Sequence, residues 1–174
     1  MTEALLTLTS AWLLAGIFAM AVRHKIMTWT RFCANLAAYE LVPERGVKAA
    51  AGLLVVTETV ATIGLLTLAD GAFLLAAGLL VTYLAAIAIN IARGRTQIDC
   101  GCGDEPTGLS QWLLLRNAAL ISIALWGSGS EVMFTAASFV VGLGLSALAL
   151  VLYATLDQMI ANHALHRRLY TGEV

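Results

Sequence analysis

The amino-acid sequence predicts an all-α, polytopic membrane helix bundle with about five transmembrane helices. Of the 174 residues, 60% are hydrophobic and only 12% are charged, whereas soluble domains average about 45–50% and 25%. A transmembrane helix needs about 20 predominantly apolar residues, and the chain contains five runs of that kind. This composition excludes a large water-soluble domain. The net charge of −1 provides no basic field for binding nucleic acid.

Five uncharged or nearly uncharged stretches are the expected spans, and together they form one membrane domain over residues 1–174. The first is followed by Arg23, His24 and Lys25 and has no basic leader, so we predict a retained helix rather than a cleaved signal peptide. Asp70-Gly71 and residues 127–131 supply polar turns between later spans. The predicted spans are residues 4–22, 49–69, 72–92, 109–126 and 132–154.

Residues 26–42 lie between the first two spans and carry a different pattern. Apolar side chains recur there at helical spacing, but Arg31, Asn35 and Glu40 would be costly to place in lipid. An amphipathic helix at the membrane interface, or packed against the bundle, suits both observations. Pro43 limits this helix at its carboxyl end. Such a helix often serves only as a connector.

The basic residues predict how the chain is oriented. With five spans, nine of the ten lie on one side of the membrane, while the acids Glu3, Asp70 and Glu131 lie on the other. The positive-inside rule then places the amino terminus outside and the carboxyl terminus in the cytoplasm of a bacterial inner (plasma) membrane. The nine bases are Arg23, Lys25, Arg31, Arg45, Lys48, Arg93, Arg95, Arg167 and Arg168.

Four polar residues are expected inside the bilayer: Glu58, Asn90, Arg116 and Asn117. A charge at the membrane centre costs about 3 kcal/mol on insertion scales and needs a partner or water. We therefore expect Glu58 and Arg116 to pair directly or through water, and the two amides to join an interhelical hydrogen-bond network. Such a network either holds the helices together or handles protons or substrate.

Residues 93–108, called here the cysteine loop, contain Cys100 and Cys102 separated by one glycine. A disulfide across one residue closes a small, strained ring, and strained disulfides are suited to exchange. The same two thiolates are also suitable ligands for soft metal ions such as Cu(I), Zn(II) or Hg(II). Cys33 is either a packing residue of the 26–42 helix or a third thiol, acting as a resolving thiol or metal ligand.

The cysteine loop and the segments around it resemble the MauE family, within the broader DoxX-like membrane proteins. The resemblance runs from about residue 23 to residue 126 and implies a four-helix core plus one extra span. It also implies an accessory role in thiol and disulfide handling, as in the maturation of methylamine dehydrogenase alongside a thioredoxin-like partner, with Cys100 and Cys102 as the redox pair. Cys33 is not part of the family motif. The matching stretches are Arg93-Gly94-Arg95, Asp99-Cys100-Gly101-Cys102-Gly103, Trp112, Leu115-Arg116-Asn117, Tyr39-Glu40-Leu41-Val42-Pro43 and Glu58.

The leading hypothesis is a membrane thiol-disulfide redox protein that supports disulfide maturation of a partner. If it is an enzyme, it is a thiol-disulfide oxidoreductase. Its partners would be membrane lipid and a thioredoxin-like or other thiol protein. A lipid quinone is a candidate electron carrier, although the sequence specifies no site for one. This hypothesis requires no metal.

Two alternatives stay open. One is a soft-metal (Hg or Cu) transporter that uses Cys100, Cys102 and Cys33, and the other is a membrane assembly factor without chemistry. The charge pattern places the cysteine loop on the cytoplasmic face, whereas an exported substrate would need it outside.

Overall fold

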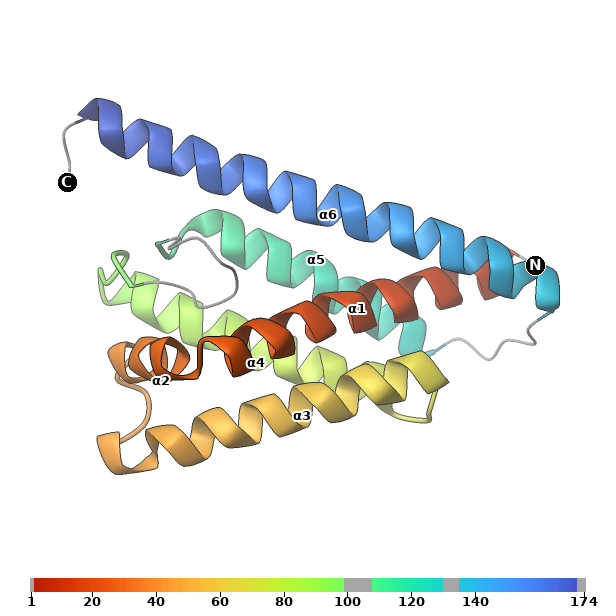
Figure 1. The fold of residues 1–174 in the computed structure, drawn as a ribbon, viewed down its shortest axis with the longest axis horizontal. Coiled ribbons are helices and arrows are strands. Elements are labelled where there is room, and N and C mark those ends of the chain that lie inside the picture. The colour runs from red at the N-terminus through yellow and green to blue at the C-terminus, as the bar shows by residue number, and fades with distance from the viewer. Residues whose placement is uncertain (1, 99–107, 130–134, 172–174) are drawn as a thin grey trace.

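Nearly all of the chain that the computed structural model describes is α-helical, as Figure 1 shows. The description covers residues 2–98, 108–129 and 135–171, with the backbone alone at 161 and 163–171. The predicted all-α class is confirmed. The elements are α1 (Thr2–Met27), α2 (Trp29–Ala38), the 3-10 turn η1 (Glu44–Gly46), α3 (Val47–Thr67), α4 (Ala72–Ala92), α5 (Gln111–Ser128) and α6 (Ala136–Thr171).

Four helical segments in the described residues are long and apolar enough to cross a membrane: α1, η1 with α3, α4, and α6 as far as Ile160. The α5 helix, at 18 residues, is not among them. Gln111, Arg116 and Asn117 lower its mean hydropathy although its other residues are largely apolar. A fifth crossing by α5 therefore stays a prediction.

The ends of the helices differ from the predicted ends of the spans at several places. The α1 helix continues to Met27 rather than ending near residue 22, and α6 continues to Thr171 rather than 154. Charged residues predict where a chain leaves lipid, but they do not stop a helix, because Arg, Lys and Glu are all good helix formers. The helix predicted over 26–42 is shorter in the structure, spanning Trp29–Ala38.

The backbone conformation after Ala38 sets the carboxyl end of α2. Tyr39 caps α2, and Glu40 adopts a left-handed conformation with φ of 49°. A non-glycine residue at positive φ interrupts the helix. The chain therefore turns three residues earlier than Pro43 alone would require.

The hydrophobic core lies between α1, α3, α4 and α5, which contribute all of its fully buried members. Many of these are alanines, and small residues let membrane helices approach closely. The α6 helix packs along α1 (Figure 1), where Gly16 lies so close to Leu150 that an added Cβ would come within 2.8 Å of Leu150 Cδ2. The core residues are Ala11, Leu14, Ala15, Phe18, Ala61, Leu65, Ala72, Ala76, Ala77, Leu79, Leu80, Leu120 and Ala124.

The two ends of the bundle differ in charge. Figure 1 shows α2, the carboxyl end of α4 and the amino end of α5 at one end, and the amino terminus with the α3–α4 turn at the other. Glu3 and Asp70 lie at the amino-terminal end, and the described bases outside α5 lie at the end that holds α2, called here the α2 end. Which end faces the cytoplasm stays a prediction.

Candidate functional site

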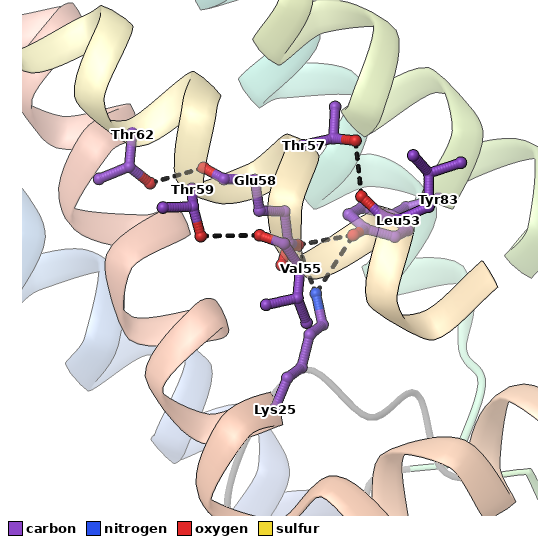
Figure 2. Close-up of polar contacts among 8 residues, drawn as sticks. All are labelled: Lys25, Leu53, Val55, Thr57, Glu58, Thr59, Thr62 and Tyr83. Carbon is purple, nitrogen blue, oxygen red and sulfur yellow. Dashed lines mark hydrogen bonds and ion pairs between the residues drawn. The ribbon is translucent and has the colours of Figure 1, made fainter. Parts of the chain in front are cut away.

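A cluster of three polar side chains lies inside the bundle where α1, α3 and α4 meet (Figure 2). The Lys25 ammonium forms an ion pair with Glu58 Oε1 and donates a hydrogen bond of 3.2 Å to the Tyr83 hydroxyl. The Tyr83 hydroxyl in turn donates to the same Glu58 oxygen at 2.6 Å. Each member therefore contacts the other two, and we call the three residues the polar triad.

The charged members of the polar triad are almost completely withdrawn from the surface. The side chain of Lys25 is 5% exposed and that of Glu58 is 1% exposed. Lysines near the end of a membrane helix usually extend toward water. Lys25 comes from the last turn of α1 and does the opposite, because its ammonium reaches inward to a carboxylate near the middle of α3.

Two aromatic rings flank the Lys25 ammonium. Its nitrogen lies 4.9 Å from the centroid of the Tyr83 ring and 5.3 Å from that of Phe32. Both distances are within the range of cation–π attraction. Phe32 is buried and belongs to α2, so α2 covers one side of the polar triad.

One oxygen of Glu58 is left without a donor. Glu58 Oε2 is buried, and within the part of the chain that the structure describes it has no hydrogen-bond partner. A buried carboxylate oxygen without a donor is costly, since it has lost water and gained nothing in return. Nearby threonines do not supply the donor, because Thr57, Thr59 and Thr62 each donate to a backbone carbonyl four residues earlier in α3 (Figure 2).

The predicted direct pairing of Glu58 with Arg116 is wrong. Arg116 Nη1 instead donates to Asp157 Oδ1 of α6 at 2.8 Å. Glu58 on α3 is paired with Lys25 of α1 and Tyr83 of α4. Arg116 on α5 instead pairs with a residue of α6. Asp157 lies beyond residue 154, the predicted end of the last span, but within α6. A prediction that continued this helix past residue 154 would have included Asp157 as a possible partner of Arg116.

The amides of Asn90 and Asn117 are buried, but they bond within their own helices rather than in the predicted interhelical network. Asn90 Nδ2 donates to the Ala86 carbonyl at 3.1 Å, and Asn117 Nδ2 donates to the Leu113 carbonyl at 2.8 Å. The structure therefore gives no interhelical hydrogen bond by which these described amides would join α4 to α5. Asn90 Oδ1 is also buried without a hydrogen-bond partner in the described residues.

Cys100 and Cys102 lie outside the described residues. Both described ends of the cysteine loop are anchored, because the Leu109 N–H, just after the loop, donates to the Thr96 carbonyl at 3.0 Å. Leu109 is buried in a small cluster with Tyr39, Ile87 and Leu113. The loop therefore begins and ends beside the carboxyl end of α2.

A second contact joins the loop to the same end of α2. Arg95 Nη2 lies 2.7 Å from Glu40 Oε1. The hydrogen bond from Arg95, with the charges of Arg95 and Arg93, holds the pKa of the exposed Glu40 carboxyl below its ordinary value. This ion pair lies at the surface and contributes little to folding.

Cys33 is a half-buried free thiol on α2 and follows Phe32 in the sequence. Among the described residues, no group of three His, Cys, Asp or Glu side chains is close enough to hold a metal ion. A metal site that includes Cys33 would therefore have to draw on ligands outside the described residues, which include Cys100 and Cys102.

Sequence reasoning missed Lys25, Tyr83 and Asp157 as site residues. The sequence groups Lys25 with the bases of the first loop, because Arg23 and His24 directly precede it. Tyr83 had a signal, as it is the only tyrosine in the 72–92 stretch, which also contains Thr82 and Asn90 as polar residues.

Comparison with known proteins gives consistent results. The model of the family described as methylamine utilisation protein MauE matches residues 3–130. Methylamine utilization protein MauE of Paracoccus denitrificans is 40% identical over 118 residues, and that of Methylophilus methylotrophus is 37% identical over 117 residues. Each alignment covers 64% of this chain and 62% of the relative, so it spans less than two thirds of the relative's length. No solved structure matches this chain significantly.

Proposed function

This chain belongs to the MauE family, and on that premise we propose that it is a membrane accessory protein of methylamine utilisation that exchanges thiols and disulfides through Cys100 and Cys102. The observation that carries the proposal is the Cys-Gly-Cys sequence in a loop whose described ends are fastened together. The backbone hydrogen bond between Leu109 and Thr96 supports it, because it joins the two described ends of the loop. The contacts of Leu109 with Tyr39 and of Arg95 with Glu40 fasten these ends to the carboxyl end of α2.

The exchange proceeds in two steps that conserve electrons and protons. In the oxidising direction, a thiolate of the partner attacks the Cys100–Cys102 disulfide and forms a mixed disulfide, releasing one cysteine of the pair as a thiolate. The partner's second thiolate then attacks the mixed disulfide, forms the partner's own disulfide and releases the other cysteine. Two electrons and two protons pass to Cys100 and Cys102. Disulfide maturation requires this direction, and the reverse direction would reduce the partner.

The proposed partner is a thioredoxin-like or other protein with an accessible thiol pair. Most of the described bases lie at the α2 end, and the positive-inside rule therefore favours a cytoplasmic position for the cysteine loop, which is part of the proposal. A membrane-impermeant thiol reagent tests this placement in intact cells. Labelling of Cys100 and Cys102 only after the cells are opened would support the cytoplasmic face, and labelling beforehand would reverse the orientation.

Trapping with single-cysteine variants tests the exchange itself. Removing the second cysteine prevents release, so Cys100→Ala or Cys102→Ala is expected to accumulate a mixed disulfide that disappears on reduction. Cys33→Ala is the matched control and should accumulate none. If neither variant of the pair forms a mixed disulfide in cells that express the methylamine utilisation proteins, thiol exchange is refuted.

Elemental analysis of the purified protein separates this function from metal transport. We expect a reversible Cys100–Cys102 disulfide without stoichiometric metal. One equivalent of Hg or Cu, lost in a Cys100→Ser/Cys102→Ser variant, would contradict exchange and favour a soft-metal carrier. Full function of that double variant in methylamine growth would favour an assembly factor without chemistry.

A further inference from the structure

We propose that Lys25, Glu58 and Tyr83 form a binding and proton-exchange site for the head group of a lipid-soluble quinone. The choice of quinone rests on the proposed function, because a thiol pair that is repeatedly used must exchange electrons with another carrier. The existence of a ligand site rests on the contacts of the polar triad alone.

The first argument is that the polar triad is an expensive way to hold helices together. Replacing a buried ion pair by apolar residues of similar volume is often neutral or stabilising. Lys25 starts near the end of α1, where an outward direction would cost far less. The Lys25–Glu58 pair carries the free-energy cost of burying two charges near the middle of α3. This cost indicates a role beyond packing.

The second argument is the unused hydrogen-bonding capacity of the polar triad. Glu58 Oε2 is a buried acceptor without a donor in the described residues. A lysine ammonium has three N–H groups, and the contacts of Lys25 with Glu58 and Tyr83 use two of them. The site therefore offers both an acceptor for a ligand hydroxyl and a donor for a ligand carbonyl.

A quinone head group presents these two functions in its two redox states. Its carbonyl accepts a hydrogen bond, which Lys25 can donate, and the quinol hydroxyl donates one, which Glu58 Oε2 can accept. The rings of Phe32 and Tyr83, already close to the ammonium, provide flat apolar faces for a planar ring.

The position of Tyr83 gives a lipid-soluble molecule a route to the polar triad. Lys25 and Glu58 are buried, whereas Tyr83 is only partly buried. Tyr83 is therefore the member of the polar triad that reaches furthest toward the surface of the bundle. A quinone can approach there without crossing water.

A quinone can accept the electrons and protons that the two thiols release. When Cys100 and Cys102 form a disulfide they lose two electrons and two protons, and a quinone that accepts both becomes a quinol. The polar triad holds transferable protons on Lys25 Nζ and the Tyr83 hydroxyl, beside a carboxylate that can receive them. Its part is to bind the head group and exchange protons with it, while the thiols supply the electrons.

Binding of decylubiquinone to the full chain in lipid nanodiscs tests the inference. The measured quantity is saturable quenching of tryptophan fluorescence at a fixed lipid content. We expect Tyr83→Phe to weaken binding of decylubiquinone at least tenfold, and Glu58→Gln to weaken binding of the reduced form, decylubiquinol, at least tenfold, because Glu58 Oε2 accepts from a quinol hydroxyl. Tyr83→Phe keeps both the ring and the Lys25–Glu58 ion pair, so it tests the site even if Glu58→Gln fails to fold. Asp157→Asn, which breaks the Arg116–Asp157 ion pair between α5 and α6, is the matched control and should bind like the wild type.

Two results would overturn the inference. One is an affinity for each form of the ligand that is equal in the wild type, Tyr83→Phe and any folded Glu58→Gln protein, and the other is quenching that never saturates, which indicates simple partition into lipid. A Cys100→Ser/Cys102→Ser variant keeps this test apart from that of the proposed function. We expect it to bind decylubiquinone normally while forming no mixed disulfide. Binding without any mixed disulfide in the trapping experiment would refute thiol exchange alone, and mixed disulfides without binding would refute the quinone site alone.

Discussion

Two interhelical ion pairs among the described residues of the bundle differ in almost every respect. Lys25 and Glu58 are 5% and 1% exposed and share Tyr83 as a third partner. Arg116 and Asp157 are 11% and 38% exposed and join α5 to α6. The first pair lies within the four-helix core, and the second attaches an outer helix near its polar end. Full burial makes the Lys25–Glu58 pair costly in desolvation free energy, which points to a functional reason for it. The partly exposed Arg116–Asp157 pair holds α6 at a small desolvation cost.

Breaking the buried pair on one side should have the largest effect. Lys25→Met leaves Glu58 as an uncompensated charge in the core, and removing one partner of a buried pair costs about 3–5 kcal/mol. We expect a strongly lowered unfolding temperature in detergent. A variant as stable as the wild type would show that Glu58 does not need the Lys25 ammonium.

Replacing the whole polar triad should have a much smaller effect on stability. Lys25→Met, Glu58→Met and Tyr83→Phe together remove both charges and the hydroxyl while nearly keeping the volume, so the free energy of unfolding should stay within about 1 kcal/mol of the wild type or rise. Decylubiquinone binding should nevertheless be lost. An equally large destabilisation in the triple variant would assign the polar triad a structural role.

The Arg116–Asp157 pair should respond weakly to the same treatment. Because Asp157 is 38% exposed, Asp157→Asn should cost about 0–1 kcal/mol in thermal unfolding. A loss as large as that of Lys25→Met would erase the distinction between the two pairs. Proteolysis near the carboxyl end of α6 gives an independent measure of whether the helix stays attached.

The surface pair between Glu40 and Arg95 should be the weakest and should depend on pH. Its arginine lowers the pKa of the Glu40 carboxyl in the folded protein. The contribution is therefore fully present above the ordinary pKa of 4.5 and disappears as the pH falls below it through the folded value. The protection of the Leu109 amide against hydrogen exchange, measured relative to the intrinsic rate at each pH, should fall over this acid range in the wild type. The Glu40→Gln variant should show no such change of protection with pH. Identical pH profiles in the variant and the wild type would contradict the Glu40–Arg95 contact.

The positions of the helices could be predicted from the sequence, because an uncharged run long enough to cross a bilayer is itself the structural signal. The α4 helix occupies residues 72–92, the same bounds as the predicted span. The full length of α6 could not be predicted in this way, since its second half is polar and loses the apolar signal while still favouring a helix.

The partners within the bundle were harder to predict than the helices. Glu58 and Arg116 were correctly singled out as polar groups within helices, but their pairing depends on which faces of α3 and α5 meet other helices. The apolar pattern carries little information about this, because lipid-facing and core-facing residues are equally hydrophobic in a membrane helix. Lys25 was hidden for a related reason, as its sequence position gives no sign that its side chain turns inward.

The most direct test of the account is the redox state of Cys100 and Cys102 in membranes, followed by thiol alkylation after decylubiquinone is added to the reduced protein. The account predicts that both thiols become protected as a disulfide in the wild type and in Asp157→Asn, and that they stay reduced in the folded triple variant of the polar triad. Thiols that stay reduced in the wild type, or that are oxidised equally fast in the triple variant, would contradict it.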